Sequence, residues 1–203
     1  APCNIALMRQ AQSVKKGVRA NGGTPREFCT ITVTDGIAMG HEGMKSSLIS
    51  REVIADSAEL TVRGHCYDAL VGIAGCDKSL PALMMSMVRL NVPSVFIYGG
   101  SILPGRYKGK DVTVVDVFEA VGKHSSGKMS SKELRKLELV ACPSAGACGG
   151  QFTANTMACV SEAIGLALPY SAGTPAPYEE RDKYAKESGK TVMNLLAKNI
   201  KPR

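Results

Sequence analysis

Apolar and polar positions alternate along the first half of the chain in a pattern typical of strands separated by helices. A helix is expected from residue 4 to about residue 20, where Gly22-Gly23 would end it, because glycine readily adopts the left-handed capping conformation. The stretch FCTITVT, residues 28–34, alternates with a period of two and predicts a strand. A second helix is expected over residues 51–64, with Ser50 as its N-cap.

The middle of the chain repeats the alternation of strand and helix. ALVGIAG, residues 69–75, predicts a short buried strand, and Ser79 begins a helix with Pro81 in its first turn, where a missing N–H costs little. SVFIY, residues 94–98, predicts the next strand. Further helices are expected around residues 114–122, 131–140, 152–166 and 179–198, the last with a candidate interruption at Ser188-Gly189.

This order of elements predicts an α/β fold, with a mainly parallel sheet flanked by helices on both faces. At 203 residues, 44% of them hydrophobic, the chain is long enough to form a domain with a substantial core. No internal repeat or interdomain linker stands out. We expect residues 1–203 to be one domain, incomplete at both ends, because the chain opens without a methionine and ends without a stopping signal.

The net charge and the number and spacing of the cysteines exclude several classes of function. The formal net charge is +7, but acidic residues interrupt the basic ones and there is no Trp, so we expect no nucleic-acid partner. No apolar run approaches the length of a membrane span, and we expect a cytoplasmic protein, or an organellar one in a eukaryote. Seven cysteines, an odd number, and no Cys-x-x-Cys pair favour free thiols over disulfides or a zinc finger.

Three stretches carry residues suited to chemistry. AGCDKSLPALM places Cys76, Asp77 and Lys78 at the carboxyl end of a predicted strand, where ligands collect in parallel sheets. CPSAGACGGQFTANTM, residues 142–157, places Cys148 in a glycine-rich turn before a helix. TVTDGIAMGHEGMKSS, residues 32–47, places Asp35 at a predicted strand end before a glycine-rich loop.

Each stretch also has a plainer interpretation. Cys76 could be a small buried hydrophobe with Asp77 as a helix cap, and Asp35 could be an ordinary turn residue. Cys148 could be incidental to a tight turn, or a nucleophile, although a nucleophilic cysteine usually has a histidine as its base. The residues alone leave these alternatives open.

Five motifs taken together resemble the dihydroxy-acid/6-phosphogluconate dehydratase family. They occur in order over nearly the whole chain, and family members are much longer, so the chain resembles the N-terminal cluster-binding domain of a larger two-domain enzyme. The motifs are PCN (2–4), DGIAMGHEGMKSSLISREVIADS (35–57), GCDKSLP (75–81), YGGSILPG (98–105) and CPSAGACGGQFTANTM (142–157).

The resemblance implies two metal groups. It assigns Cys3, Cys76 and Cys148 to an iron-sulfur cluster of the 2Fe-2S type, and three thiolates would leave one iron position open. It assigns Asp35 and Asp77 to Mg²⁺, together with Lys78 carrying a carbamate, which supplies an anionic oxygen suited to a hard cation. Cys76 would then face iron while its two neighbours face magnesium.

The other candidate residues receive no metal role. Cysteines 29, 66, 142 and 159 match no ligand position and are interpreted as structural, and neither His41 nor Glu42 has an assigned role. Two positions depart from the family pattern: Ala82 stands where glycine is usual and Gln151 where methionine is usual. Because neither is a ligand position, the departures concern packing or substrate preference.

The implied activity is that of a hydro-lyase in branched-chain amino acid biosynthesis. It converts 2,3-dihydroxy-3-methyl acids, which are small-molecule substrates, into 2-keto acids, and the enzyme is expected to be a homodimer. The family's proton-abstracting serine is expected beyond Arg203, so these residues alone should be inactive. The alternatives are a sugar-acid or 6-phosphogluconate dehydratase and, from another class, a noncatalytic iron-sulfur module for sensing or electron transfer.

Overall fold

The computed structural model describes residues 1–203, which form nine helices and four strands. None of the helices is both long and apolar enough to cross a bilayer. In chain order the elements are α1 (Pro2–Ile5), α2 (Leu7–Ala20), α3 (Asp35–Ala38), α4 (Gly43–Gly64), β1 (Leu70–Ala74), α5 (Ser79–Leu90), β2 (Ser94–Tyr98), β3 (Gly105–Tyr107), β4 (Lys110–Val112), α6 (Val114–Ser125), α7 (Ser131–Ala141), α8 (Thr153–Ala163) and α9 (Glu180–Ala197).

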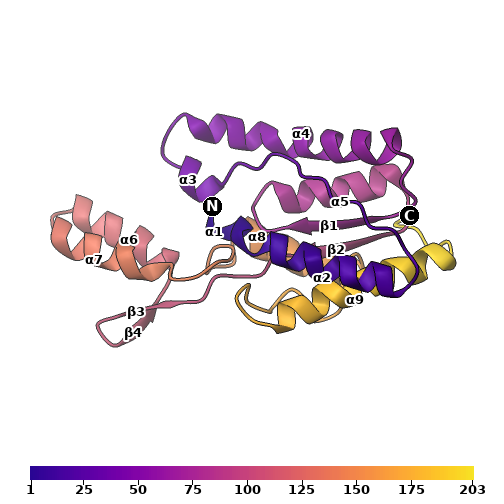
Figure 1. Cartoon of the computed structure of the whole chain (residues 1–203). Helices are drawn as coiled ribbons and strands as arrows, with labels where there is room; N and C mark the ends of the chain where they lie inside the picture. Colours follow the sequence, from indigo (N-terminus) through magenta and orange to yellow (C-terminus); the bar gives the residue numbers. More distant parts are fainter.

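Helices cover both faces of a small parallel sheet. β1 and β2 pair in parallel, with Leu70 opposite Ser94 and Ala74 opposite Tyr98, and an isolated bridge joins Phe96 to Ala167. Helices α5 and α8 pack on one face, with α4 outside α5, while α2 and α9 pack on the other (Figure 1). The expected α/β class is confirmed, although the sheet has fewer strands than the sequence predicts.

The unit from β1 through α5 to β2 forms where the sequence predicts it. All five residues of β2 are buried, as expected for a central strand covered on both faces. Helix α5 begins at Ser79 with Pro81 in its first turn, and it ends at Leu90, capped by Asn91 in the left-handed conformation at φ 52°. This unit therefore fixes the position of the corner that follows β1.

The predicted strand at residues 28–34 is wrong. This segment is an extended connection between α2 and α3 and makes no ladder with another strand. Phe28 packs against the main core, whereas Cys29 and Ile31 are exposed, so the alternating apolar positions of this segment do not form a buried face. Asp35 consequently begins the short helix α3 rather than ending a strand.

Two predicted helix boundaries also differ. Helix α4 begins at Gly43, so Ser50 is an interior residue whose hydroxyl donates to the Ser47 carbonyl at 2.6 Å. Helix α9 continues without a break through Ser188-Gly189. Gly189 does not interrupt the helix but allows another helix to pack closely against it. A β-carbon on Gly189 would lie 2.3 Å from the Val14 carbonyl oxygen, so the small residue permits the close approach of α2 and α9.

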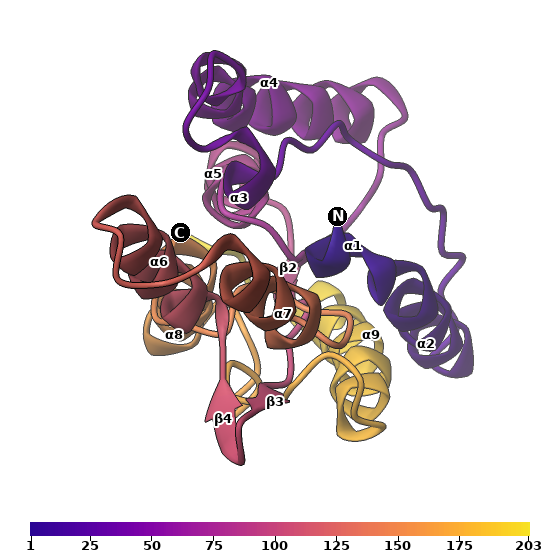
Figure 2. The ribbon, with the colours of Figure 1, turned by 90° about the vertical axis from the view of Figure 1, so that its left-hand side faces the viewer.

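A smaller lobe projects from the rest of the chain, which forms the body of the molecule. The lobe comprises β3, β4, α6 and α7, residues 105–141, and its two helices lie side by side toward the viewer in Figure 2. The hairpin turns through Lys108 and Gly109, both with positive φ, as a two-residue type I′ turn requires. Val112, Ala120, Leu137 and Ala141 form a core separate from that of the body.

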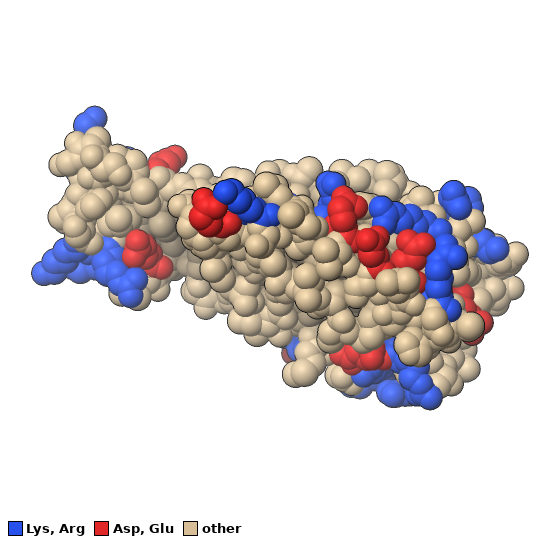
Figure 3. Space-filling model, turned by 90° about the horizontal axis from the view of Figure 1, so that it is seen from above, with Lys and Arg blue, Asp and Glu red and all other residues tan.

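Charged side chains pair with one another on the surface. Where charged groups gather on the face in Figure 3, acidic and basic ones lie beside each other. On α4 and α5, Arg89 contacts Asp56 at 3.0 Å and Glu52 at 3.5 Å, while Glu52 also accepts from Arg51. Exposed pairs of this kind contribute little stability each, so they explain the charged surface without defining a site.

Candidate metal centre

Three predicted cysteine ligands line one cavity at the carboxyl end of β1. Cys3 comes from α1, Cys76 follows β1, and Cys148 precedes α8, yet all three border a cavity of about 190 Å³. Cys3 and Cys76 are buried and Cys148 is partly buried. The fold thus brings together thiols from segments that are more than 70 residues apart in sequence.

Glycine at two positions allows the backbone segments around this cavity to approach one another. A β-carbon on Gly75 would lie 1.9 Å from the carbonyl oxygen of Cys3, so only glycine lets α1 sit against the β1 corner. Gly146 has φ +134°, and its N–H donates to the Pro2 carbonyl at 2.8 Å. These contacts tie the N-terminal cysteine to both of the other cysteine segments.

The Cys148 turn is held by backbone and side-chain hydrogen bonds. Ala147 is bridged to the segment after β2, donating to Gly100 at 2.9 Å and accepting from Ile102 at 2.7 Å. The amide nitrogen of Asn155 donates to the carbonyls of Cys148, at 2.7 Å, and of Gly150, at 2.5 Å. The Asn155 oxygen in turn accepts from the buried Tyr98 hydroxyl.

The predicted magnesium ligands lie beside the thiols. Lys78 Nζ donates to Asp35 Oδ2 at 2.5 Å, and the Ser47 hydroxyl donates to Asp35 Oδ1. The Asp77 carboxylate is 6% exposed and lines the cavity, where the Cys76 thiol contacts its Oδ2 at 3.7 Å. Asp35 lies between two lining residues without itself lining the cavity.

Crowding of acidic groups shifts their pKa values. The Cys76 thiol donates to Cys3, which lowers the pKa of Cys3 to about 7, while the same bond and burial raise the pKa of Cys76. Burial and the negative charge of Asp35 raise the pKa of Asp77. Burial, then the charge of Asp77, raises the pKa of Cys148 to about 11. Bound cations would relieve this repulsion, so the donor set suits metals.

The donors share a cavity without converging on a single point. No three His, Cys, Asp or Glu side chains form a closed metal-ligand group. The three thiols are instead spread around a space lined also by Ile102 and Ala154, and Lys78 pairs with Asp35. A group larger than one ion fits the spread of the thiols, whereas ligation by the individual residues stays a prediction.

One cysteine near the site was missed by sequence reasoning. Cys142, interpreted as structural, is exposed but lines the same cavity where the lobe joins the body, and desolvation of its thiol raises its pKa. Cysteines 29, 66 and 159 are also exposed, and they do not line this cavity. The position of Cys142 six residues before Cys148 is the only sequence signal for it.

The polar loop between α3 and α4 makes local contacts only. The His41 ring contacts the Ile37 carbonyl at 2.8 Å, and Gly43 N–H donates to His41 Nδ1 at 3.0 Å. Glu42 pairs with Lys45 at 2.5 Å. Neither His41 nor Glu42 lines the cavity.

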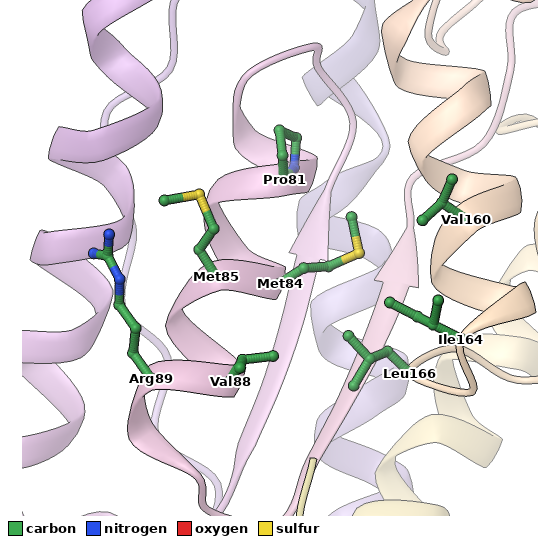
Figure 4. A pocket seen from close by; sticks show the side chains of 8 residues that line it. All are labelled: Pro81, Met84, Met85, Val88, Arg89, Val160, Ile164 and Leu166. Atoms are coloured by element: carbon green, nitrogen blue, oxygen red, sulfur yellow. The ribbon is translucent and has the colours of Figure 1, made fainter. Parts of the chain in front are cut away.

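A second, larger hollow lacks reactive groups. It measures about 400 Å³ and lies between α5 and α8, where Met84, Val88, Val160 and Ile164 face it from the two helices (Figure 4). Arg89 is its only charged lining residue. The thiol-lined cavity, rather than this apolar hollow, is therefore the candidate metal centre.

Comparison with known proteins identifies the family of the chain. The profile of the family described as "Dihydroxy-acid/6-phosphogluconate dehydratase N-terminal" matches residues 1–203. Proteins named dihydroxy-acid dehydratase are similar over the whole chain: that of Pelagibacter ubique is 95% identical, that of Parvibaculum lavamentivorans 83%, and that of Metallosphaera sedula 55%. The chain spans 36%, 35% and 36% of their respective lengths. The chain therefore belongs to the dihydroxy-acid/6-phosphogluconate dehydratase family and corresponds to its N-terminal part.

Proposed function

We propose that the protein carrying this chain removes water from 2,3-dihydroxy-3-methyl carboxylic acids to give 2-keto acids, the dehydration used in making valine and isoleucine, and hence leucine. Support comes from the family match and from relatives named dihydroxy-acid dehydratase. The single observation that carries the proposal is the cavity shared by Cys3, Cys76 and Cys148. Three thiols from distant segments beside a buried carboxylate are unusual unless they serve a metal.

The reaction sets the requirements that the site must meet. A weakly acidic proton leaves C2, the hydroxyl leaves C3, and the two depart as one water, after which the enol rearranges to the 2-keto acid. Negative charge builds on oxygen in both steps. When bound, an iron-sulfur cluster with one open iron position, together with Mg²⁺, supplies Lewis acidity at those oxygens.

The chain's own residues would hold these groups. Cys3, Cys76 and Cys148 are the proposed cluster ligands, and the lowered pKa of Cys3 favours its thiolate. Asp77 offers a buried carboxylate to Mg²⁺ and Asp35 a second one. The apolar lining residues Ile102, Val114 and Ala154 would exclude water from the space between.

Lys78 would contribute as a carbamate. Its neutral amine nitrogen forms a bond to the carbon of CO₂, and the displaced proton passes to solvent, which gives an anionic oxygen ligand. The ion pair of Lys78 with Asp35, at 2.5 Å, would have to open for this reaction. Formation of the carbamate removes the positive charge of the Lys78 ammonium that pairs with Asp35. Bound Mg²⁺ would supply a positive charge beside Asp35 in its place.

The substrate class is tested with the full-length protein that carries these residues. Formation of 2-keto acid from 2,3-dihydroxyisovalerate, with little from gluconate, arabonate or 6-phosphogluconate, is expected. A preference for one of the sugar acids would contradict the proposed substrate while retaining the dehydratase class. Cluster content without dehydration of any of them, and with reversible one-electron chemistry, would favour the noncatalytic module.

The role of Asp77 is tested by Asp77→Asn. Because the amide keeps the shape but removes one of two crowded negative charges, we expect the metal-free protein to gain about 1 kcal/mol of stability. The same change should weaken Mg²⁺ binding at least about tenfold, measured by titration calorimetry. Lower stability together with unchanged Mg²⁺ affinity would show that Asp77 is a structural carboxylate.

A further inference from the structure

A chain of partly buried hydrogen bonds connects the end of β2 to the turn that carries Cys148. It begins at the Tyr98 hydroxyl, which donates to Asn155 Oδ1 on α8, and continues from Asn155 Nδ2 to the carbonyls of Cys148 and Gly150. Tyr98 is 1% exposed, so its hydroxyl has no alternative partner in water. Neither Tyr98 nor Asn155 lines the cavity.

Cys76 and Cys148, two of the proposed cluster ligands, are held in position in different ways. Cys76 follows β1 directly and is 2% exposed, so the strand itself places it. Cys148 lies in a partly buried glycine-rich turn that has no strand before it, and glycines on both sides make the turn conformationally permissive. Its conformation must be fixed by contacts from elsewhere.

The contacts that fix the turn of Cys148 come from the carboxyl end of β2 and the residues directly after it. Gly100 and Ile102 fix the residue before Cys148 through the backbone, and Tyr98 fixes Cys148 and Gly150 through Asn155. The β2 end is itself held in place, since Gln10 donates to the Gly99 carbonyl at 2.7 Å. The end of β2 therefore fixes the conformation of the Cys148 turn, although the two segments are far apart in sequence.

We propose that Asn155, held by Tyr98, is a positioning residue that keeps the Cys148 thiol directed into the cavity for ligation. This inference rests on the proposed function, because it assumes that Cys148 binds a cluster. Asn155 acts through the Cys148 and Gly150 carbonyls and Tyr98 acts only through Asn155. The effects of the two residues should consequently be coupled rather than additive.

The first test is the alkylation rate of each cysteine in the metal-free full-length protein, measured by mass spectrometry after iodoacetamide pulses. Asn155→Ala should raise the rate at Cys148 about tenfold, because two hydrogen bonds that hold the turn are lost. Tyr98→Phe, which keeps the ring, should raise it about threefold. The double variant should match Asn155→Ala alone.

A control variant separates positioning from a loss of stability. Ser86→Ala removes another buried hydroxyl, one that donates to the Ala55 and Ala82 carbonyls at 3.0 Å on the α4 and α5 side of the body. It should lower the unfolding midpoint without changing the ratio of Cys148 to Cys76 alkylation. Equal acceleration at Cys3, Cys76 and Cys148 in Asn155→Ala would overturn the inference, as would an unchanged rate at Cys148.

The second test uses the cluster-loaded protein. Iron release to a chelator should be about tenfold faster from Asn155→Ala than from wild type, and unchanged in Ser86→Ala. Release at the wild-type rate would overturn the positioning role. Wild-type protein that binds no iron would instead overturn the proposed cluster, and the alkylation rates would still decide whether Asn155 holds the turn.

Discussion

The body and the lobe of this molecule are built by different means. In the body, buried polar groups form hydrogen bonds over long sequence separations, as when Arg181 on α9 donates to the carbonyl of Tyr98. In the lobe, an exposed ion pair between Lys108 and Glu133, at 3.2 Å, joins the hairpin to α7, and the core has four residues. The comparison indicates that precise placement of the cavity depends on the body.

The two regions nevertheless meet at the cavity. Val114, the first residue of α6, and Cys142, directly after α7, both line it. The part of the lobe next to the body therefore forms one wall of the cavity. The outer part of the lobe can vary in sequence without changing the proposed ligands. Substitutions in the two regions should separate these contributions.

The largest effect is expected for Arg181→Ala in the body. Arg181 is fully buried, and burial lowers the pKa of its guanidinium to about 10, so the residue is still charged at neutral pH. Truncation leaves a cavity and two buried carbonyls without donors, which should cost about 4 kcal/mol. Urea denaturation measures the loss, and a cost below about 1 kcal/mol would show that the body does not depend on this side chain.

A slightly smaller loss is expected for Gly75→Ala. The new methyl group would collide with the Cys3 carbonyl oxygen, 1.9 Å away, and backbone atoms cannot move aside cheaply. A loss of about 3 kcal/mol of stability is expected, together with greater alkylation of Cys3 as α1 is displaced. Gly109→Ala in the hairpin turn is a matched control, because a β-carbon there meets nothing although φ is positive. Equal reactivity of Cys3 in both variants would contradict the close packing of α1.

An intermediate effect is expected for Leu137→Ala in the lobe core. Leu137 is 4% exposed, and its truncation should cost about 2 kcal/mol. Hydrogen exchange should locate the loss in α6 and α7, with the amides of β1 and β2 as protected as in wild type. Equal loss of protection in body and lobe would show that the two regions unfold together.

The smallest effect is expected for Lys108→Ala. Its ion pair with Glu133 is exposed, and pairs of this kind contribute little. The unfolding midpoint should stay unchanged within the error of calorimetry. A resolvable decrease would show that the outer lobe is held by its charges rather than by its small core.

Sequence reasoning identified the elements whose signals are local. β1, α5 and β2 follow from apolar runs bounded by helix caps, and they place Cys76. The alternation at residues 28–34 was misleading because its apolar positions Cys29 and Ile31 are exposed, and the segment pairs with no other strand. The hairpin of β3 and β4 was missed because three-residue strands carry almost no periodic signal.

The site was only partly visible in the sequence for a similar reason. Motif resemblance named Cys3, Cys76 and Cys148, and the structure brings them to one cavity. The roles of Arg181 and Cys142 depend on contacts between distant segments, which no local pattern records. Asn155 lies within a motif used for the resemblance, but its bonds to Tyr98 and Cys148 are visible only in the folded chain.

The central claim is that the three cysteines of the shared cavity hold an iron-sulfur cluster. The most direct test is iron and acid-labile sulfide per chain in anaerobically purified full-length protein, with a visible absorption spectrum. We expect about two irons and two sulfides in wild type and in the exposed-cysteine control Cys29→Ser, and loss of both from Cys3→Ser, Cys76→Ser and Cys148→Ser. Full iron and sulfide content in any of these three variants would contradict the claim.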